Sequence, residues 1–309
     1  MQPLEWSKLG LLYTAKNLHP KLLSHAANPL PIHLQDDIYR IFFCGRDCNN
    51  RSSVGFVDAD IIKRKIIGSS NKPVFEYGDE ISFFSHGVSI GSSYAIGKTN
   101  YILFMGWQNS LDKHWKGDIG RLVLSEDFTL NLDNEKPFLG AAEVDSLSLS
   151  YPWVMKESKI YHMWYGSTIT WDAGNGEMLH VIKHAVSNNG HEWVKTEFGL
   201  PYKLGVAQAF SRPTVWGNYI SGYHMFFSYR GGSRMKYRIG YAASKDLRHW
   251  EMILDKVGLD VSPSGWDSEM IEYPFVFEHK KRIYMLYNGN GYGKTGFGLA
   301  VLESELLIE

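Results

Sequence analysis

The fold is decided by the stretch YHMFFSYR at residues 223–230, because the chain contains five versions of it. The other four are YRIFFCGR at 39–46, YILFMGWQ at 101–108, YHMWYGST at 161–168 and YMLYNGNG at 284–291. Their leading tyrosines are separated by 62, 60, 62 and 61 residues. A fixed period along a whole chain is the signature of a repeat protein, so five structural repeats are predicted.

Each repeat is predicted to contain four antiparallel β-strands. The five copies are apolar runs too short for helices and bounded by Gly, Ser or Asn, which indicates buried strands. Because proline is tolerated as the first residue of a strand, a shorter strand is predicted to start about ten residues earlier, at Pro29, Gly91, Pro152, Pro213 and Pro274. A third strand follows each copy, and a fourth is predicted at 72–75 and 136–139. This pattern predicts an all-β fold, a five-bladed β-propeller.

The N-terminal segment is predicted to complete the last blade. Few residues follow Ala300, so the fifth repeat lacks a fourth strand of its own. The segment around Trp6 resembles those around Trp193 and Trp250, which occupy fourth-strand positions. Its pairing with the fifth repeat would remove an open sheet edge. We therefore expect residues 1–309 to form a single propeller domain.

Composition narrows the function classes. The formal net charge of the 309 residues is −1, so no basic field favours a nucleic-acid partner. No apolar run has membrane-spanning length, and the N-terminus does not begin a signal segment. We expect a cytoplasmic protein without a cofactor or a bound metal. Cys44 and Cys48 are interpreted as reduced thiols, with a disulfide or a metal pair as the alternative.

Polar and aromatic residues are predicted to gather at one end of the propeller. They enter the first strands or lie in the loops between the second and third strands, which share one face. Aromatic rings beside amides and charged groups suit sugars, which offer an apolar ring face and many hydroxyls. The predicted ligand-binding residues, for a small molecule or an oligosaccharide, are Asn28, Arg46, Arg51, His86, Trp107, Gln108, Tyr151, Trp171, Asp172, Arg212, Tyr229, Arg230, Tyr273, Asn288, Asn290 and Tyr292.

Four of these residues are arginines, and they are the least expected feature in a chain of nearly zero net charge. Guanidinium groups match the geometry of carboxylates and phosphates. One interpretation is that the ligand carries an anionic group. The alternative is that nearby carboxylates neutralise the arginines, namely Asp47, Asp267 and Glu272.

The repeats and strand openings such as Ala27-Asn28-Pro29 and Glu272-Tyr273-Pro274 resemble a known group. This group is the five-bladed propeller glycoside hydrolases of the arabinanase, xylosidase and invertase clan, with the mannoside phosphorylases nearby. The run from Gly265 to Gly293 resembles a subgroup associated with bacterial surface-glycan and sugar-biosynthesis settings. The resemblance covers essentially the whole chain. It implies a propeller fold and an activity at a glycosidic bond, either hydrolysis or transfer.

Two departures from these families bear on mechanism. Arabinanase-like members carry an Asp just before the blade-1 proline as the base, whereas this chain has Asn28. An amide cannot accept a proton from water at neutral pH. The phosphorylases share the Asn-Pro pair but carry Asp-Pro-Arg in blade 2, where this chain reads Ile90-Gly91-Ser92. We therefore expect neither mechanism to apply as a whole.

Four carboxylates are candidates for catalysis. Glu272 lies two residues before its proline, where the clan places a general acid, although in a different blade. Asp267 and Glu269 precede that strand and offer a second carboxylate, and Asp47 lies next to Arg46. The alternatives are an ion pair for Glu272, a turn for Asp267 and a positioning role for Asp47. Two functions stay open: an enzyme with two acidic residues flanking the glycosidic bond, and a carbohydrate-binding propeller that has lost its base.

Overall fold

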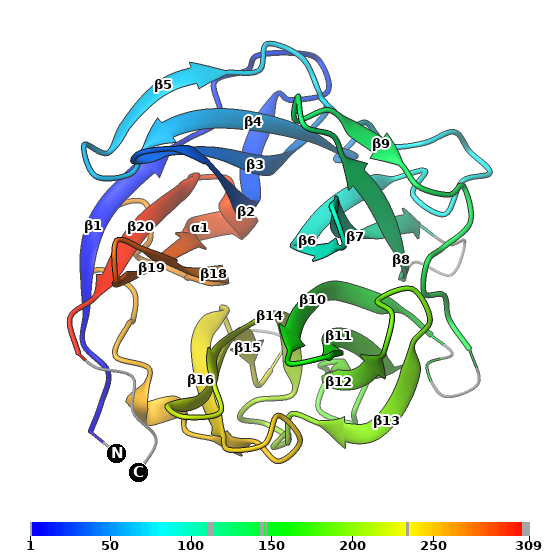
Figure 1. The fold of residues 1–309 in the computed structure, drawn as a ribbon, viewed down its shortest axis with the longest axis vertical. Helices are drawn as coiled ribbons and strands as arrows, with labels where there is room; N and C mark the ends of the chain where they lie inside the picture. The colour runs from blue at the N-terminus through cyan, green and yellow to red at the C-terminus, as the bar shows by residue number, and fades with distance from the viewer. Residues whose placement is uncertain (1, 110–113, 143–144, 146, 233–234, 305–309) are drawn as a thin grey trace.

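The computed structural model describes residues 2–109, 114–142, 145, 147–232 and 235–304. Within these residues, strand pairing divides the chain into five groups of four, here called blades 1 to 5. Figure 1 shows the blades arranged around a central axis, as in a β-propeller. Neighbouring strands in every blade are antiparallel, and single parallel pairs join blade 1 to blade 2 and blade 3 to blade 4.

The blades share one order of strands from the axis outward (Figure 1). The innermost strands are β2 (Ser24–Gln35), β6 (Gly87–Ile96), β10 (Leu149–Glu157), β14 (Ala209–Asn218) and β18 (Glu272–His279). The second strands are β3 (Ile38–Arg46), β7 (Thr99–Asn109), β11 (Ile160–Thr170), β15 (Gly222–Arg230) and β19 (Arg282–Asn288). The third strands are β4 (Ser52–Asp60), β8 (Trp115–Leu124), β12 (Leu179–Ser187), β16 (Arg238–Ser244) and β20 (Phe297–Leu302).

The outermost strands are β5 (Lys65–Ser69), β9 (Leu130–Leu132), β13 (Val194–Gly199), β17 (Glu251–Met252) and β1 (Trp6–Tyr13). Two short helices complete the described elements, the 3-10 helix η2 (Leu254–Lys256) and α1 (Asn290–Gly293). In the part of the chain that the structure describes, no helix is long and apolar enough to cross a membrane.

The five sequence copies begin in the second strands, as predicted. Their apolar residues are almost completely buried, because both faces of these strands are covered by other parts of the protein. Trp164 on β11 is an example: it is fully buried and its ring meets Trp250 edge to face at 5.9 Å between centroids. Aromatic side chains therefore fill the spaces between elements, which explains their abundance in the sequence.

The N-terminal strand completes blade 5, as predicted. β1 pairs antiparallel with β20, from Trp6 opposite Leu302 to Tyr13 opposite Phe297. The ammonium group of Lys8 on β1 forms a 2.8 Å ion pair with Asp267, which comes from the same blade. The ladder and this ion pair hold the first strand of the chain against the last.

The predicted position of the prolines is wrong. The axial prolines lie inside the innermost strands rather than at their first residues. The residue before each proline has a left-handed φ, 54° at Asn28, 40° at Tyr151, 45° at Arg212 and 53° at Tyr273. The ladder register shifts at the same place in all four strands. Such a β-bulge interrupts the ladder, so proline loses no hydrogen bond there.

The predicted outer strands of blades 1 and 2 are also wrong. They are β5 and β9, which follow the preceding strand at once, whereas 72–75 and 136–139 form only isolated bridges at Phe75 and Leu139. Each of these later runs begins with a Lys-Pro pair. The missing N–H of Pro73 and of Pro137 prevents a continuous ladder there.

Candidate functional site

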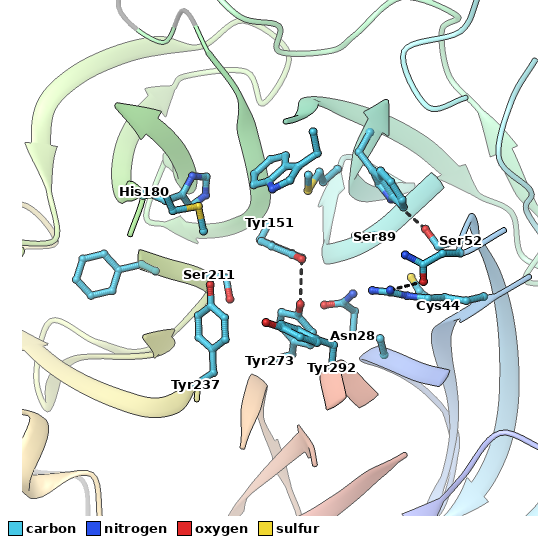
Figure 2. A pocket seen from close by; sticks show the side chains of 18 of the residues that line it. Asn28, Cys44, Ser52, Ser89, Tyr151, His180, Ser211, Tyr237, Tyr273 and Tyr292 are labelled. Carbon is cyan, nitrogen blue, oxygen red and sulfur yellow. Dashed lines mark hydrogen bonds between the residues drawn. The ribbon is translucent and has the colours of Figure 1, made fainter. Parts of the chain in front are cut away.

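A cavity of about 390 Å³ opens at the axis, and all five blades contribute to its wall (Figure 2). The bulges before the axial prolines place Asn28, Tyr151 and Tyr273 on this wall. Figure 2 shows these side chains around a common space with Ser211 and Tyr237. The other lining residues are Ala27, Cys44, Arg46, Asn50, Ser52, Ser89, Met105, Trp107, Asn109, Trp115, Met178, His180, Phe210, Arg230 and Tyr292.

Aromatic and phenolic groups form much of the wall. The hydroxyls of Tyr151 and Tyr273 lie 3.2 Å apart, and their rings pack at 5.3 Å between centroids. Burial raises the pKa of Tyr151 to about 12 and raises the pKa of Tyr273 well above its ordinary value. Both phenols are therefore protonated and able to donate hydrogen bonds at neutral pH. On the opposite side, the indole N–H of Trp107 donates to Ser52 at 3.1 Å. The wall therefore offers ring faces and neutral hydroxyls together.

The cavity wall is cationic. Of the described residues that line it, two are arginines and none is an aspartate or a glutamate. Arg230 forms a 2.8 Å ion pair with Glu177, which lies behind it. Arg46 donates to the amide oxygen of Asn50 at 2.6 Å, and no described carboxylate is its ion-pair partner. Arg46 therefore brings a positive charge to the wall that no carboxylate of the described chain neutralises.

The other two predicted arginines lie elsewhere. Arg212 is 1% exposed and lies beneath the cavity, where its guanidinium donates to the backbone oxygen of Pro29 at 2.7 Å. Burial lowers its pKa to about 10, so it keeps its charge at neutral pH. Arg51 pairs with Asp47 at 2.9 Å, away from the wall. The four arginines do not converge on one point.

Glu272 is a buried carboxylate on which the charges of Arg46 and Arg230 act. It is completely buried, and neither of its carboxyl oxygens has a hydrogen-bond partner within the described residues. Burial raises the pKa of Glu272 well above its ordinary value of 4.5, whereas the charges of Arg46 and Arg230 act to lower it. Glu272 does not itself line the cavity, but Tyr273, the next residue, does. The side chain is therefore a buried acid beneath the wall, and its burial favours the protonated form.

The remaining candidate carboxylates, Asp47, Asp267 and Glu269, lie outside the cavity wall. Asp47 accepts the backbone N–H groups of Asn49 and Arg51, both at 2.8 Å, as a turn residue. Asp267 is 1% exposed and accepts from the Tyr287 hydroxyl at 3.0 Å in addition to its ion pair with Lys8. The backbone of Glu269, not its carboxylate, makes the contacts that hold its loop.

Several other predicted binding residues hold loops in place. Asn288 accepts the N–H of Asn28 at 2.9 Å, and Asn290 accepts the N–H of Glu269 at 2.8 Å. Asp172 accepts the N–H of Gly174 at 2.8 Å. Four more predicted binding residues do not line the cavity, namely His86, Gln108, Trp171 and Tyr229. Trp171 stacks on His114 at 4.6 Å, which makes it part of the aromatic surroundings of Trp115.

Sequence reasoning missed several wall residues. His180 is held between the hydroxyls of Ser150 at 2.6 Å and Thr168 at 2.8 Å, and burial lowers its pKa to about 3, so it is neutral. Ser211 occupies the same place in blade 4 that Glu272 occupies in blade 5, two residues before the proline. Alignment of the repeats at their prolines was the signal for Ser211.

No metal site accompanies the cavity. Among the described residues, no group of three or more His, Cys, Asp or Glu side chains is placed to hold a metal ion. Cys44 and Cys48 are both free, and Cys44 is buried in the wall while Cys48 is exposed. The chemistry available at the site therefore consists of arginine charges, neutral hydroxyls, aromatic faces and one buried acid.

Solved structures with this fold are glycoside hydrolases. One described as a glycoside hydrolase superposes with a TM-score of 0.73 at 13% identity, over 97% of this chain and 92% of that chain. A GH130 glycoside hydrolase that targets β-1,2 mannosidic linkages in Candida mannan gives 0.69 at 12%, over 97% and 94%. The sucrose-6-phosphate hydrolase from Lactobacillus gasseri gives 0.62 at 13%, over 86% and 56%. At these identities the likeness establishes the propeller fold.

Sequence comparison gives nearer relatives. No protein-family profile matches the chain. Two proteins of Mycobacterium tuberculosis, Uncharacterized protein MT1551 of strain CDC 1551 / Oshkosh and Uncharacterized protein Rv1502 of strain ATCC 25618 / H37Rv, are each 40% identical over 301 residues. The alignments cover 97% of this chain and 99% of each relative. The chain therefore belongs to the family of MT1551 and Rv1502, whose fold is that of the propeller glycoside hydrolases.

Proposed function

We propose that the protein is carbohydrate-active and that its axial cavity binds a sugar carrying an anionic group. The observation that carries this proposal is the composition of the cavity wall. It combines Arg46 and Arg230 with tryptophan and tyrosine rings, and its described residues include no Asp or Glu. Aromatic faces suit the apolar side of a sugar ring, and guanidinium groups suit a phosphate or a carboxylate.

Arg46 is the expected anchor of the anion. Its positive charge lacks a carboxylate partner among the described residues, whereas Arg230 is already paired with Glu177. An anion beside Arg46 gains a charge-assisted hydrogen bond in a partly enclosed site, where screening by water is weaker than at an open surface. One protein with a similar fold is named as a sucrose-6-phosphate hydrolase, which supports a phosphorylated sugar as a ligand.

A catalytic step at a glycosidic bond is a second candidate, favoured by the raised pKa of the buried Glu272. Hydrolysis by two flanking carboxylates has no support, because the described wall supplies neither member of the pair. Transfer to phosphate needs one acid. Glu272 would give its proton to the glycosidic oxygen as the bond to the anomeric carbon breaks. Phosphate held by the arginines would form the new bond to that carbon and return a proton to Glu272.

Binding is tested by calorimetric titration with inorganic phosphate, a hexose phosphate and the corresponding neutral hexose. We expect the phosphorylated ligands to bind more tightly than the neutral sugar. Arg46→Gln should weaken the binding of inorganic phosphate and of the hexose phosphate by about tenfold or more, because one charge-assisted hydrogen bond is lost. Arg51→Gln is the matched control, since Arg51 lies outside the wall. Equal binding of neutral and phosphorylated sugar, or equal effects of the two variants, would refute the proposal.

Turnover is tested separately. A panel of aryl glycosides is incubated with the protein, with and without phosphate, and the released sugar is identified. The transfer mechanism requires a sugar phosphate that forms only with phosphate and is absent for Glu272→Gln. A wild-type protein that binds hexose phosphates but converts no glycoside would be a binding propeller, which the Asn28 at the position of the base also favours.

A further inference from the structure

The five innermost strands carry equivalent residues at the start of the β-bulge, a level here called the floor, and two of these residues, Ala27 and Ser211, line the cavity. In four blades the β-bulge begins after the residue that stands two positions before the axial proline. In blade 2, where Ser92 takes the place of the proline, the bulge begins after Ile90. The same backbone geometry therefore sets these five side chains at a common depth along the axis. They are Ala27, Ile90, Ser150, Ser211 and Glu272 in the order of the blades. The floor is apolar on blades 1 and 2 and polar on blades 3 to 5.

The polar half of the floor contains unsatisfied groups. Ser150 is paired with the ring of His180 at 2.6 Å. The hydroxyl of Ser211 and both carboxyl oxygens of Glu272 are buried and have no hydrogen-bond partner within the described residues. Buried polar groups in folded proteins nearly always have partners, so two exceptions at equivalent places of neighbouring blades, one of them on the cavity wall, indicate a group that binds there.

These two residues belong to neighbouring blades that are in contact at this level. The hydroxyl of Thr214 on β14 donates to the backbone oxygen of Pro274 on β18 at 2.7 Å. Both residues lie within three positions of Ser211 and Glu272, respectively. Ser211 also lines the cavity, so its side of the floor is open to a ligand.

The rim of the cavity has a different character. Tyr292 is 38% exposed, whereas Ser211 is 4% and Glu272 0% exposed. Arg46 on the wall is bonded to the exposed Asn50, and the guanidinium of Arg230 lies 3.4 Å from the hydroxyl of Tyr292. The two arginines of the wall therefore lie toward solvent, whereas the charged guanidinium of Arg212 is buried beneath the floor and bonded to the backbone oxygen of Pro29.

We propose that Ser211 and Glu272 form a subsite for a hydroxyl group of a phosphorylated monosaccharide, which enters sugar first and leaves its phosphate at Arg46 and Arg230. This inference rests on the proposed function, because it assigns the orientation of the anionic sugar. A hydroxyl both donates and accepts a hydrogen bond, so it can pair with the hydroxyl of Ser211 and with the carboxyl oxygens of Glu272, which have no partner within the described residues. A phosphate at the floor would instead be buried beside the Glu272 carboxyl group, while the guanidinium of Arg212 beneath it is already bonded to the backbone oxygen of Pro29.

The test compares two probes, inorganic phosphate and a panel of hexose phosphates, by calorimetric titration. Inorganic phosphate needs only the rim, whereas a hexose phosphate needs the rim and the floor. Ser211→Ala is expected to weaken hexose phosphate by about fivefold to tenfold, as for one lost hydrogen bond, and to leave inorganic phosphate unchanged. Ser53→Ala is the matched control: its hydroxyl is also buried and without a partner in the described chain, but it does not line the cavity.

Glu272 provides an independent arm. Glu272→Gln keeps a neutral group that donates and accepts, so hexose phosphate should bind within about twofold of the wild type. Glu272→Leu removes both functions and should weaken hexose phosphate selectively. Thermal unfolding of each variant checks that it is folded. A monodeoxy hexose phosphate that lacks the recognised hydroxyl should bind wild type and Ser211→Ala equally, because the interaction is already absent.

The outcomes separate the two proposals. If the wild type binds neither phosphate nor any hexose phosphate, the proposed function fails and the subsite with it. If phosphate binds at Arg46 but Ser211→Ala and Glu272→Leu change both probes equally or not at all, the anion site stands and the floor subsite is refuted. A selective loss of hexose phosphate in both variants, absent in Ser53→Ala, supports the subsite.

Discussion

Removal of the Trp6 side chain tests whether the N-terminal strand is an energetic part of the propeller. Trp6 on β1 is 9% exposed and meets Phe226 of blade 4 edge to face at 5.6 Å between ring centroids. It therefore joins two blades that are distant in the sequence. Because its indole N–H has no hydrogen-bond partner in the described structure, Trp6→Ala leaves no polar group unpaired. The change isolates apolar packing.

The expected cost follows from burial. Trp-to-Ala changes in well-packed interiors cost about 3–5 kcal/mol, and an edge-to-face ring pair contributes about 0.5–1.5 kcal/mol of such a loss. Whole domains are stable by only about 5–15 kcal/mol. Trp6→Ala should therefore remove about a fifth or more of the free energy of unfolding, although it changes a single residue.

Urea unfolding followed by far-ultraviolet circular dichroism measures this loss. Leu11→Ala is the control on the same strand, since Leu11 is 44% exposed and its truncation should cost less than about 1 kcal/mol. A Trp6→Ala variant that unfolds at the same urea concentration as Leu11→Ala would show that β1 lies against blade 5 without stabilising it. The reasoning on blade closure would then be wrong.

Two further predictions follow from charge. Five histidines have pKa values lowered to about 3–4, chiefly by burial: the half-buried His25 and the buried His162, His180, His184 and His224. In the unfolded chain these histidines take up protons near pH 6.5, whereas in the folded chain they stay neutral until about pH 4. The free energy of unfolding is therefore unaffected above pH 6.5 and decreases as the pH falls toward 4. Unfolding midpoints measured between pH 7.5 and 4 should fall from about pH 6.5 downward, and a flat profile would contradict these shifts. Asn28→Asp places a carboxylate 3.5 Å or so from Arg212 and on the cavity wall; phosphate binding should weaken by about tenfold, because an added negative charge opposes the anion. Unchanged phosphate affinity in a titration would place the anion away from this wall.

The repeat period allowed the strands to be predicted, but not their internal geometry. The copies starting at Tyr39, Tyr101, Tyr161, Tyr223 and Tyr284 located the second strands because a buried strand has a strong local signal. The bulges before the prolines were missed, because a left-handed residue such as Asn28 or Tyr151 leaves no mark in hydrophobic periodicity. The same bulges decide which side chains reach the axis.

The carboxylates show why site prediction was harder than fold prediction. Asp267 lies near Glu272 in the sequence, but the folded chain pairs it with Lys8, 259 residues away. Asp47 is held by Arg51, a partner that sequence proximity alone could have suggested. Arg212 lies under the cavity because its left-handed backbone turns it toward Pro29. Ion pairs between distant segments and backbone turns therefore determined which charges face the cavity.

The pairing of β1 with β20 has a consequence for synthesis on the ribosome. Tyr13 and its partner Phe297 are 284 residues apart. At translation rates of about 5–20 residues per second, the first strand waits roughly 15–60 s before its partner exists. During that time its backbone N–H and C=O groups form a free edge that other nascent chains can extend. The propeller thus reaches its final pairing only after β20 has left the ribosome, and its yield in a cell depends on how well this edge is shielded until then.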